Sequence, residues 1–413
     1  MRRIVLANWA LFLGIGLLLV ANGLLLTLLT VRANELGFSA TAIGVMQAGY
    51  PAGALAGTLL APRLIERAGH VRAFAALAAI CSITAIVHLL TEDVATWTAM
   101  RVLAGVCFPG LYVITESWLN AQAANRERAQ VLSVYFLLQS GGTAAGAALV
   151  GWPGAGQAVL FGLVSILVSL SVVPLLLSRV VVPRHDRAEP MPLTRLYRIS
   201  PMAISGAVLN GAAMGVLFIT APLYMLELGV DRAVAATLVS AMTLVGAAAQ
   251  YPVGWISDRI DRRWVVLALS AAGAAFAAAA VPTGPSAALL LLSAAAAVCV
   301  PTYSVCLAHA NDQLKPSQIV PAGGAMAFSL NLGLLGGAFA GPAAVDLAGP
   351  AGFPALLMAL FAGTAAVAAA RRAVTAAPAE TGQAQRVGGF GGPQTSYLQT
   401  EAAIEAEERR DAR

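Results

Sequence analysis

Two short charged stretches, one in each half of the 413-residue chain, decide how the sequence is organised. Residues 62–72 read PRLIERAGHVR, and residues 254–263 read GWISDRIDRR. The acidic residue of the first stretch, Glu66, recurs 192 residues later as Asp258, and each is followed directly by an arginine. Each stretch lies between two long apolar runs, which predicts a short loop joining two membrane-crossing helices.

The composition excludes an ordinary soluble protein. Hydrophobic residues make up 59% of the chain and charged residues 11%, whereas soluble chains have about 45–50% and about 25%. A soluble fold of this length would need a polar surface that these residues cannot form. The cysteines lie within apolar runs without metal-type spacing, which argues against a disulfide scaffold or a metal site; they are Cys81, Cys107, Cys299 and Cys306.

The apolar runs set the fold class. A run of about 20 apolar residues spans the hydrocarbon core of a bilayer as one helix. The sequence therefore predicts an all-α membrane protein with twelve transmembrane helices in two six-helix repeats. The runs lie at about residues 6–30, 41–62, 72–90, 97–119, 127–150, 157–178, 201–226, 233–256, 264–282, 286–309, 319–345 and 350–370.

The basic residues indicate the orientation, because arginine and lysine concentrate on the cytoplasmic side of membrane proteins. Placing the N-terminus inside puts 22 of the 25 basic residues in inner loops or the tail, and leaves Arg32 and Arg232 in outer loops. Both termini are therefore expected in the cytoplasm. The net charge of +5 is then a topology signal, and no nucleic-acid partner is expected.

Composition also divides the chain into four parts. Residues 1–178 form the predicted N-terminal six-helix bundle, and residues 201–370 form the C-terminal one. The segment 179–200 carries arginines and prolines and is predicted to be a cytoplasmic linker. Residues 371–413 turn glycine-rich and then highly charged, which predicts a disordered cytoplasmic tail.

Further matches at the same offset support a duplication. Glu-Leu-Gly at 35–37 recurs at 227–229, and Val-Cys-x-Pro at 106–109 recurs at 298–301. Two halves of six helices each have the same orientation in the membrane, so they form parallel repeats. That architecture places a solute site near the bilayer midplane between the halves.

The quoted loops resemble the G-x-x-x-D-R-x-G-R signature of the major facilitator superfamily. Pro62 and Glu66 depart from it in the first copy, and Asp261 departs from it in the second. Arg101, with a glycine four residues on, resembles the second motif of the superfamily, and ESWLN at 116–120 resembles a bacterial YcaD-like branch. The resemblance covers nearly all of residues 6–370. It implies a transporter that works by alternating access and a coupling role for Arg101.

The acidic–arginine pairs of the two loops are candidate latches at the cytoplasmic gate. A carboxylate at a helix end can pair with an arginine, and such a link can break when the halves move. The alternative is that these are solvated charges of ordinary inner loops. The candidate latch residues are Glu66, Arg67, Asp258 and Arg259, with Arg126 and Arg128 on a neighbouring loop.

The predicted helix 97–119 carries charge inside the membrane. At 100° per residue, Arg101, Gly105, Phe108, Tyr112 and Glu116 fall within about 80° of one another. Arg101 and Glu116 are about 22 Å apart along the helix, so each needs its own partner. Charges within a membrane are functional candidates by default, which makes these two candidates for proton coupling or ion pairing.

Each of the two charges has an alternative interpretation. Glu116 is either a protonatable coupling site or part of a cytoplasmic ion-pair cluster with the inner-loop arginines named above. Arg101 is either the coupling residue that the resemblance implies or an interfacial residue paired with Glu35 or Glu92.

Polar side chains within the apolar runs are candidates for a solute cavity. In membranes such groups also serve as hydrogen-bond links between helices, and that alternative stays open. The candidate cavity residues are Asn22, Tyr112, Gln139, Asn210 and Asn331.

Together these features predict a secondary active transporter of a small neutral or amphipathic solute, coupled to protons, with export as one direction. The expected location is the inner membrane of a bacterium, and a monomer suffices because one chain holds both halves. No serine–histidine–aspartate set, P-loop or metal cluster is visible in the sequence, so neither an enzyme nor a cofactor is expected. The alternative function is a non-transporting membrane receptor or scaffold that keeps the fold.

Overall fold

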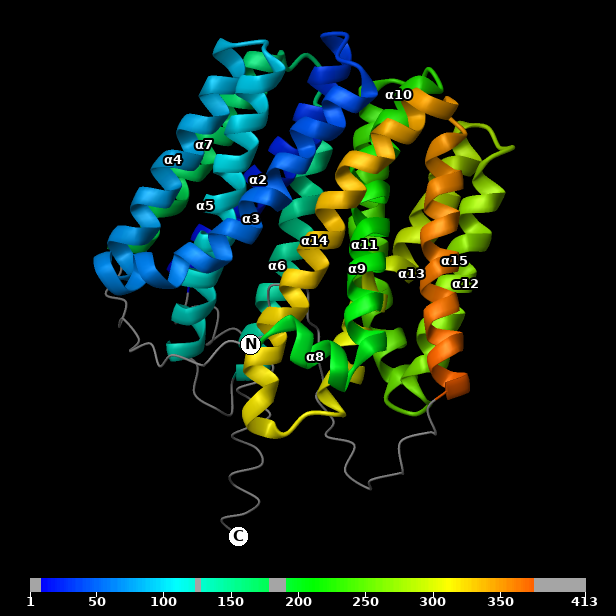
Figure 1. Cartoon of the computed structure of the whole chain (residues 1–413). Coiled ribbons are helices and arrows are strands. Elements are labelled where there is room, and N and C mark those ends of the chain that lie inside the picture. The colour runs from blue at the N-terminus through cyan, green and yellow to red at the C-terminus, as the bar shows by residue number, and fades with distance from the viewer. Residues whose placement is uncertain (1–8, 123–127, 178–190, 375–413) are drawn as a thin grey trace. The chain divides into compact units, whose positions relative to one another are not determined.

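The described part of the chain consists of helices joined by short connections (Figure 1). The computed structural model describes residues 9–122, 128–177 and 191–374. In the N-terminal half the helices are α2 (Trp9–Glu35), α3 (Ala40–Ala68), α4 (His70–Leu90), α5 (Val94–Gln122), α6 (Arg128–Leu149) and α7 (Gln157–Leu177). In the C-terminal half they are α8 (Leu193–Ile199), α9 (Pro201–Gly215), the π-helix η1 (Val216–Thr220), α10 (Ala221–Glu227), α11 (Arg232–Ser257), α12 (Arg262–Ala280), α13 (Pro285–Asn311), α14 (Pro316–Ala348) and α15 (Gly352–Val374).

Each of the twelve predicted apolar runs corresponds to one long helical segment, which confirms the predicted fold class. The seventh run is composite, because η1 interrupts it between α9 and α10. Ten helical segments of the described residues are long and apolar enough to cross a membrane. The short helix α8 lies within the predicted linker, and the predicted tail beyond residue 374 lies outside the described residues.

The helices group into two compact units by their contacts. The first unit holds the described residues up to 177, together with 215–244 and 335–353. The second unit holds 191–214, 245–334 and 354–374. The first unit therefore includes parts of four helical segments from the C-terminal half of the sequence, namely the α9–η1–α10 segment, α11, α14 and the start of α15.

Glycines allow the closest helix contacts in both units. In the first unit, Gly49, Gly53 and Gly57 lie one turn apart on α3, and a Cβ on any of them would press on the α5 backbone. In the second unit, a Cβ on Gly211 of α9 would collide with the Leu330 backbone of α14. Lipid tails are as apolar as leucine, so helices in a membrane associate through close packing of small residues rather than through hydrophobic burial.

We predict that Gly53→Ala destabilises the protein by about 1–3 kcal/mol, because the added methyl group overlaps the Val102 carbonyl oxygen and forces α3 and α5 apart. The matched control is Gly141→Ala in α6, where a Cβ meets no atom within 4 Å. Thermal unfolding of the detergent-solubilised chain measures both. A midpoint for Gly53→Ala equal to that of the control would contradict the packing argument.

Candidate functional site

Arg101 is buried inside the first unit. Arg101 is only 1% exposed to solvent, and its Cζ atom lies 4.7 Å from the centre of the Tyr50 ring on α3. Gly105 makes this contact possible, because a side chain there would collide with the Tyr50 backbone and push α3 away. The Nε and Nη1 atoms of Arg101 have no hydrogen-bond partner in the described structure. A guanidinium held against a ring face with free donors is poised to bind an incoming acceptor.

The two acids considered as partners of Arg101 bind a different arginine. Arg32, at the end of α2, lies 2.9 Å from Glu92 and 3.5 Å from Glu35. Glu35 also accepts a hydrogen bond of 2.6 Å from Gln157. These groups are partly exposed and lie at helix ends. The interfacial ion pairs are therefore formed by Arg32, and Arg101 lies in the interior of the bundle without them.

Polar groups from α2 and from α5 itself lie beside the Arg101–Tyr50 contact. Asn22 of α2 lies next to the hydroxyl groups of Tyr50 and Tyr112. Phe108 packs between the two tyrosines, with ring centroids 6.5 Å from Tyr50 and 6.2 Å from Tyr112. The Asn22 Oδ1 atom and the Tyr112 hydroxyl have no hydrogen-bond partner among the described residues. The structure thus brings together Asn22, Arg101 and Tyr112 as a group with unused hydrogen-bonding capacity.

Glu116 lies nearer than Arg101 to the C-terminal end of α5 and is 4% exposed. The hydroxyl group of Tyr135 on α6 donates a hydrogen bond of 2.7 Å to its carboxyl group. Within the described ranges no basic side chain lies at ion-pair distance from Glu116. The side chains of Arg126 and Arg128, two predicted partners, lie outside the described residues. A buried carboxyl group held by a neutral donor can take up and release a proton without breaking an ion pair.

The remaining predicted cavity residues lie in separate surroundings. Asn210 of α9 is 1% exposed, and its Oδ1 atom accepts a hydrogen bond of 3.5 Å from the Cys299 thiol of α13. Asn331 of α14 donates a hydrogen bond of 2.9 Å to Ala327 of its own helix. Gln139 is half-buried on α6. Asn210 and Asn331 belong to the second unit, and Gln139 belongs to the first.

The charged loop of the second unit forms a network that differs from the predicted pair. Asp258 contacts Arg262 at 3.3 Å, and Arg262 also lies 2.7 Å from Asp312 at the end of α13. Arg259 instead stacks on the Trp255 ring, with its Cζ atom 3.6 Å from the ring centre. The loop therefore joins α11, α12 and α13 through Arg262.

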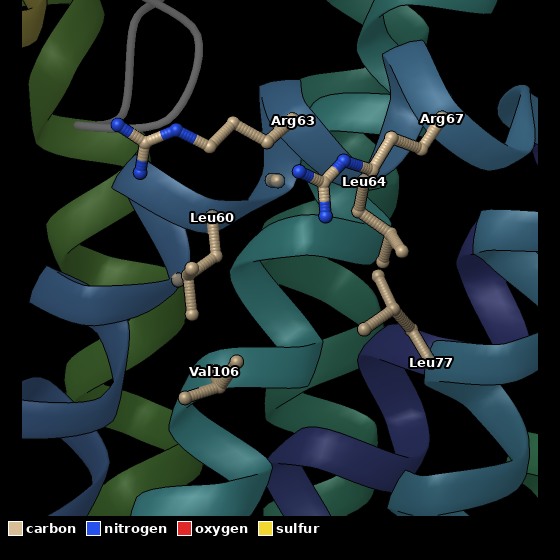
Figure 2. A pocket seen from close by; sticks show the side chains of 8 residues that line it. Leu60, Arg63, Leu64, Arg67, Leu77 and Val106 are labelled. Atoms are coloured by element: carbon tan, nitrogen blue, oxygen red, sulfur yellow. The ribbon is translucent and has the colours of Figure 1, made fainter.

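In the first unit, Glu66 and Arg67 are exposed at the end of α3, and Arg67 lines a cavity (Figure 2).

Asp261, where the loop departs from the superfamily signature, directly precedes α12. Its Oδ1 atom accepts a hydrogen bond of 2.9 Å from the Arg263 backbone N–H, and its Oδ2 atom lies 2.7 Å from the Arg263 guanidinium. These bonds to the charged form lower the pKa of the Asp261 carboxyl group. The departure from glycine thus supplies an N-cap for α12.

We predict that Asp261 gives the protein an acid-sensitive part of its stability. Because the folded-state pKa is below the unfolded value of about 3.9, this stabilisation is complete above the unfolded value and disappears as the pH falls through the folded one. Asp261→Asn should lower the unfolding midpoint at pH 7 and flatten its change below about pH 4. Identical acid profiles for the variant and the wild type would contradict this role.

Asp346 of α14 was missed by the sequence reasoning. It accepts hydrogen bonds from the backbone N–H groups of Ala40 at 3.2 Å and Thr41 at 2.6 Å, at the N-terminus of α3. A carboxylate there stabilises the helix through its free N–H groups and its dipole. In the same unit, Ser240 donates a hydrogen bond of 2.9 Å to the Ala144 carbonyl group. These bonds join helices from the two sequence halves, a role that an isolated aspartate in the sequence does not reveal.

We predict that Asp346→Ala weakens the contact between α3 and α14. The lost cap corresponds to about 1 kcal/mol, or about fivefold in an opening equilibrium. The assay uses a background in which the four native cysteines are replaced by alanine and the buried residue Ala338 of α14 is replaced by cysteine. In this background, Asp346→Ala should increase the rate at which a maleimide labels position 338. Asp93→Ala is the matched control, because Asp93 caps only its own helix through Thr96 at 2.8 Å. Equal labelling rates in the two variants would contradict this role of Asp346.

Long apolar helices that enclose charged and polar side chains define a polytopic integral membrane protein. The chain matches the family model described as Major Facilitator Superfamily over residues 11–226 and again over 203–403. The chain therefore belongs to the major facilitator superfamily, as the motifs predicted.

The similar curated proteins are bacterial members of the same superfamily. The chain is 27% identical over 256 residues to an uncharacterized MFS-type transporter of Enterobacter sp. (strain 638), covering 61% of this chain and 67% of that protein. It is also 27% identical over 255 residues to the uncharacterized MFS-type transporter YcaD of Escherichia coli (strain K12 / DH10B), with the same coverage. These matches confirm the predicted likeness to the YcaD-like branch.

Solved transporter structures share the fold. The nucleoside transporter NupG matches with a TM-score of 0.72 at 14% identity, covering 90% of this chain and 99% of NupG. The E. coli fucose:proton symporter FucP matches with a TM-score of 0.56 at 15% identity, covering 89% of this chain and 99% of FucP. At these identities the likeness establishes the architecture and leaves the solute to be inferred from the chain itself.

Proposed function

We propose that this protein is a secondary active transporter that moves a small solute across the inner membrane of a bacterium by alternating access, coupled to protons. Glu116 is the protonation site, and Arg101 with Asn22 and Tyr112 contributes to the solute site. Both termini lie in the cytoplasm, which places the α5 end that carries Glu116 on the cytoplasmic side.

The observation that carries the proposal is the surroundings of Glu116. A carboxylate inside a membrane is unfavourable unless it is paired or protonated. Its described partner is the Tyr135 hydroxyl at 2.7 Å, a neutral donor that bonds either form of the carboxyl group. No basic side chain of the residues that the structure describes lies within ion-pair distance of Glu116, so this arrangement favours a group that gains and loses a proton over a permanent ion pair.

The polar groups near Arg101 favour a neutral or amphipathic solute. Asn22 and Tyr112 offer neutral hydrogen-bonding atoms beside the aromatic rings of Tyr50 and Phe108. Rings and amides suit a solute with an apolar body and a few polar groups. Arg101 supplies one set of cationic donors, enough to orient a carbonyl or hydroxyl oxygen of such a solute.

Two sets of contacts serve as gates in this proposal. With cytoplasmic termini, the N-terminus of α3 lies at the outer surface, so Asp346 belongs to the outer gate. The charged loops at the ends of α3 and α11 then lie on the inner side, where Arg262 links Asp258 to Asp312. The solute site is reached from alternate sides when these links break in turn.

We predict that Glu116→Gln abolishes proton-driven uptake and retains solute exchange, since an amide keeps the Tyr135 hydrogen bond but takes up no proton. The assay uses proteoliposomes with an internal pH indicator and a panel of nucleosides, hexoses and amphipathic aromatic amines. Glu92→Gln, at an exposed carboxylate paired with Arg32, is the matched control and should keep wild-type coupling.

The outcomes separate the parts of the proposal. Proton-coupled flux that survives Glu116→Gln would remove Glu116 from the coupling site. Flux of a strongly anionic solute that depends on Arg101 would overturn the neutral or amphipathic solute class. Solute binding to the purified chain without exchange or flux would favour the receptor function over transport.

A further inference from the structure

A cavity lies on the first unit where α3 passes α4 and α5 (Figure 2). Its volume is about 310 Å³, and most of its wall is apolar. The α3 side of the wall ends in two arginines one helical turn apart, Arg63 and Arg67. The lining residues are Gly57, Leu60, Ala61, Arg63, Leu64, Arg67, Leu77 and Val106. An apolar cavity with a cationic rim at one end matches an amphipathic anion.

The two arginines belong to no ion pair within the described part of the chain. Both are exposed on the last turns of α3. Figure 2 shows both guanidinium groups at the same end of the cavity, with Leu60, Leu64, Leu77 and Val106 beyond them. Like charges four residues apart on a helix repel each other. An anion that bridges Arg63 and Arg67 would remove this repulsion.

The cavity is accessible from outside the bundle. Leu60 on its wall is 48% exposed, and the neighbouring Leu59 is 62% exposed. Exposed leucines on a membrane-crossing helix are expected to face acyl chains. In the proposed orientation this end of α3 lies at the cytoplasmic headgroup level, where basic groups between helices attract anionic lipids.

We propose that this cavity binds one anionic phospholipid of the cytoplasmic leaflet. The phosphate group accepts hydrogen bonds from Arg63 and Arg67, and an acyl chain lies against Leu60, Leu64 and Val106. Guanidinium groups donate to phosphate oxygens with matching geometry, which favours a charged headgroup over a zwitterionic one. The proposal uses the predicted orientation but is independent of the transported solute and of proton coupling.

The test is native mass spectrometry of the detergent-solubilised full chain, titrated with phosphatidylglycerol or with phosphatidylcholine of the same acyl chains. We expect the wild type to bind the first phosphatidylglycerol about tenfold more tightly than phosphatidylcholine. Arg63→Gln with Arg67→Gln should abolish this preference. The matched control is Arg72→Gln with Arg195→Gln, which removes two exposed charges that do not line the cavity and should keep the preference.

A second variant tests the apolar wall. Val106→Phe fills the cavity without changing charge and should weaken binding of both lipids, while soluble glycerol phosphate tests the headgroup alone. Equal binding of the two lipids by the wild type would overturn the proposal, as would a preference that survives the double arginine variant. Glycerol phosphate that competes as well as the whole lipid, or unchanged lipid binding in Val106→Phe with an unchanged unfolding midpoint, would also overturn it.

Discussion

Hydrocarbon offers a peptide group no hydrogen-bond partner, and this constraint governs the rest of the structure. Every membrane-crossing segment must satisfy its own backbone groups, so the described chain is built from helices. Those helices cannot associate by hiding apolar surface from lipid, since lipid is equally apolar. They associate where small residues allow the backbones to meet, as Gly53 and Gly105 do between α3 and α5. That contact also sets the place of Tyr50 and hence of the Arg101 guanidinium.

The duplicated architecture carries the two proposed coupling residues in only one half. At the repeat offset of 192, Arg101 corresponds to Ser293, whose hydroxyl group donates to Leu289 of its own helix at 2.8 Å. Glu116 corresponds in the same way to Ala308. Buried charge is unfavourable in a bilayer, so the second half keeps the helix pattern and drops the charges. Repeated backbone geometry thus coexists with a one-sided placement of the proposed coupling residues.

The helices were predictable and many side-chain partners were not, for physical reasons. The length and hydropathy of a spanning segment are set by the apolar bilayer core, so the predicted runs match the twelve observed segments to within six residues at their ends. The ion-pair partner of Asp258 depends on the direction of the side chains at a helix junction. Arg262 points toward Asp258 and forms the ion pair, whereas Arg259 stacks on Trp255. Asp346 meets the α3 N-terminus across more than 300 residues of sequence, and no local pattern encodes such a contact. The Gly49, Gly53 and Gly57 spacing was visible in the sequence and would have predicted the α3–α5 contact.

The π-helix η1 changes how the seventh membrane segment must be drawn. One extra residue in a turn rotates everything beyond it by about 100° relative to an unbroken α-helix. A helical wheel drawn through Val216–Thr220 therefore misplaces one end of the segment, and Asn210 and Tyr224 do not share the face that their spacing suggests. A wide turn is also mechanically soft, because its hydrogen bonds already depart from the i to i+4 ladder. The segment can bend at this point with little further loss of backbone bonding, so its two ends are free to follow different neighbours.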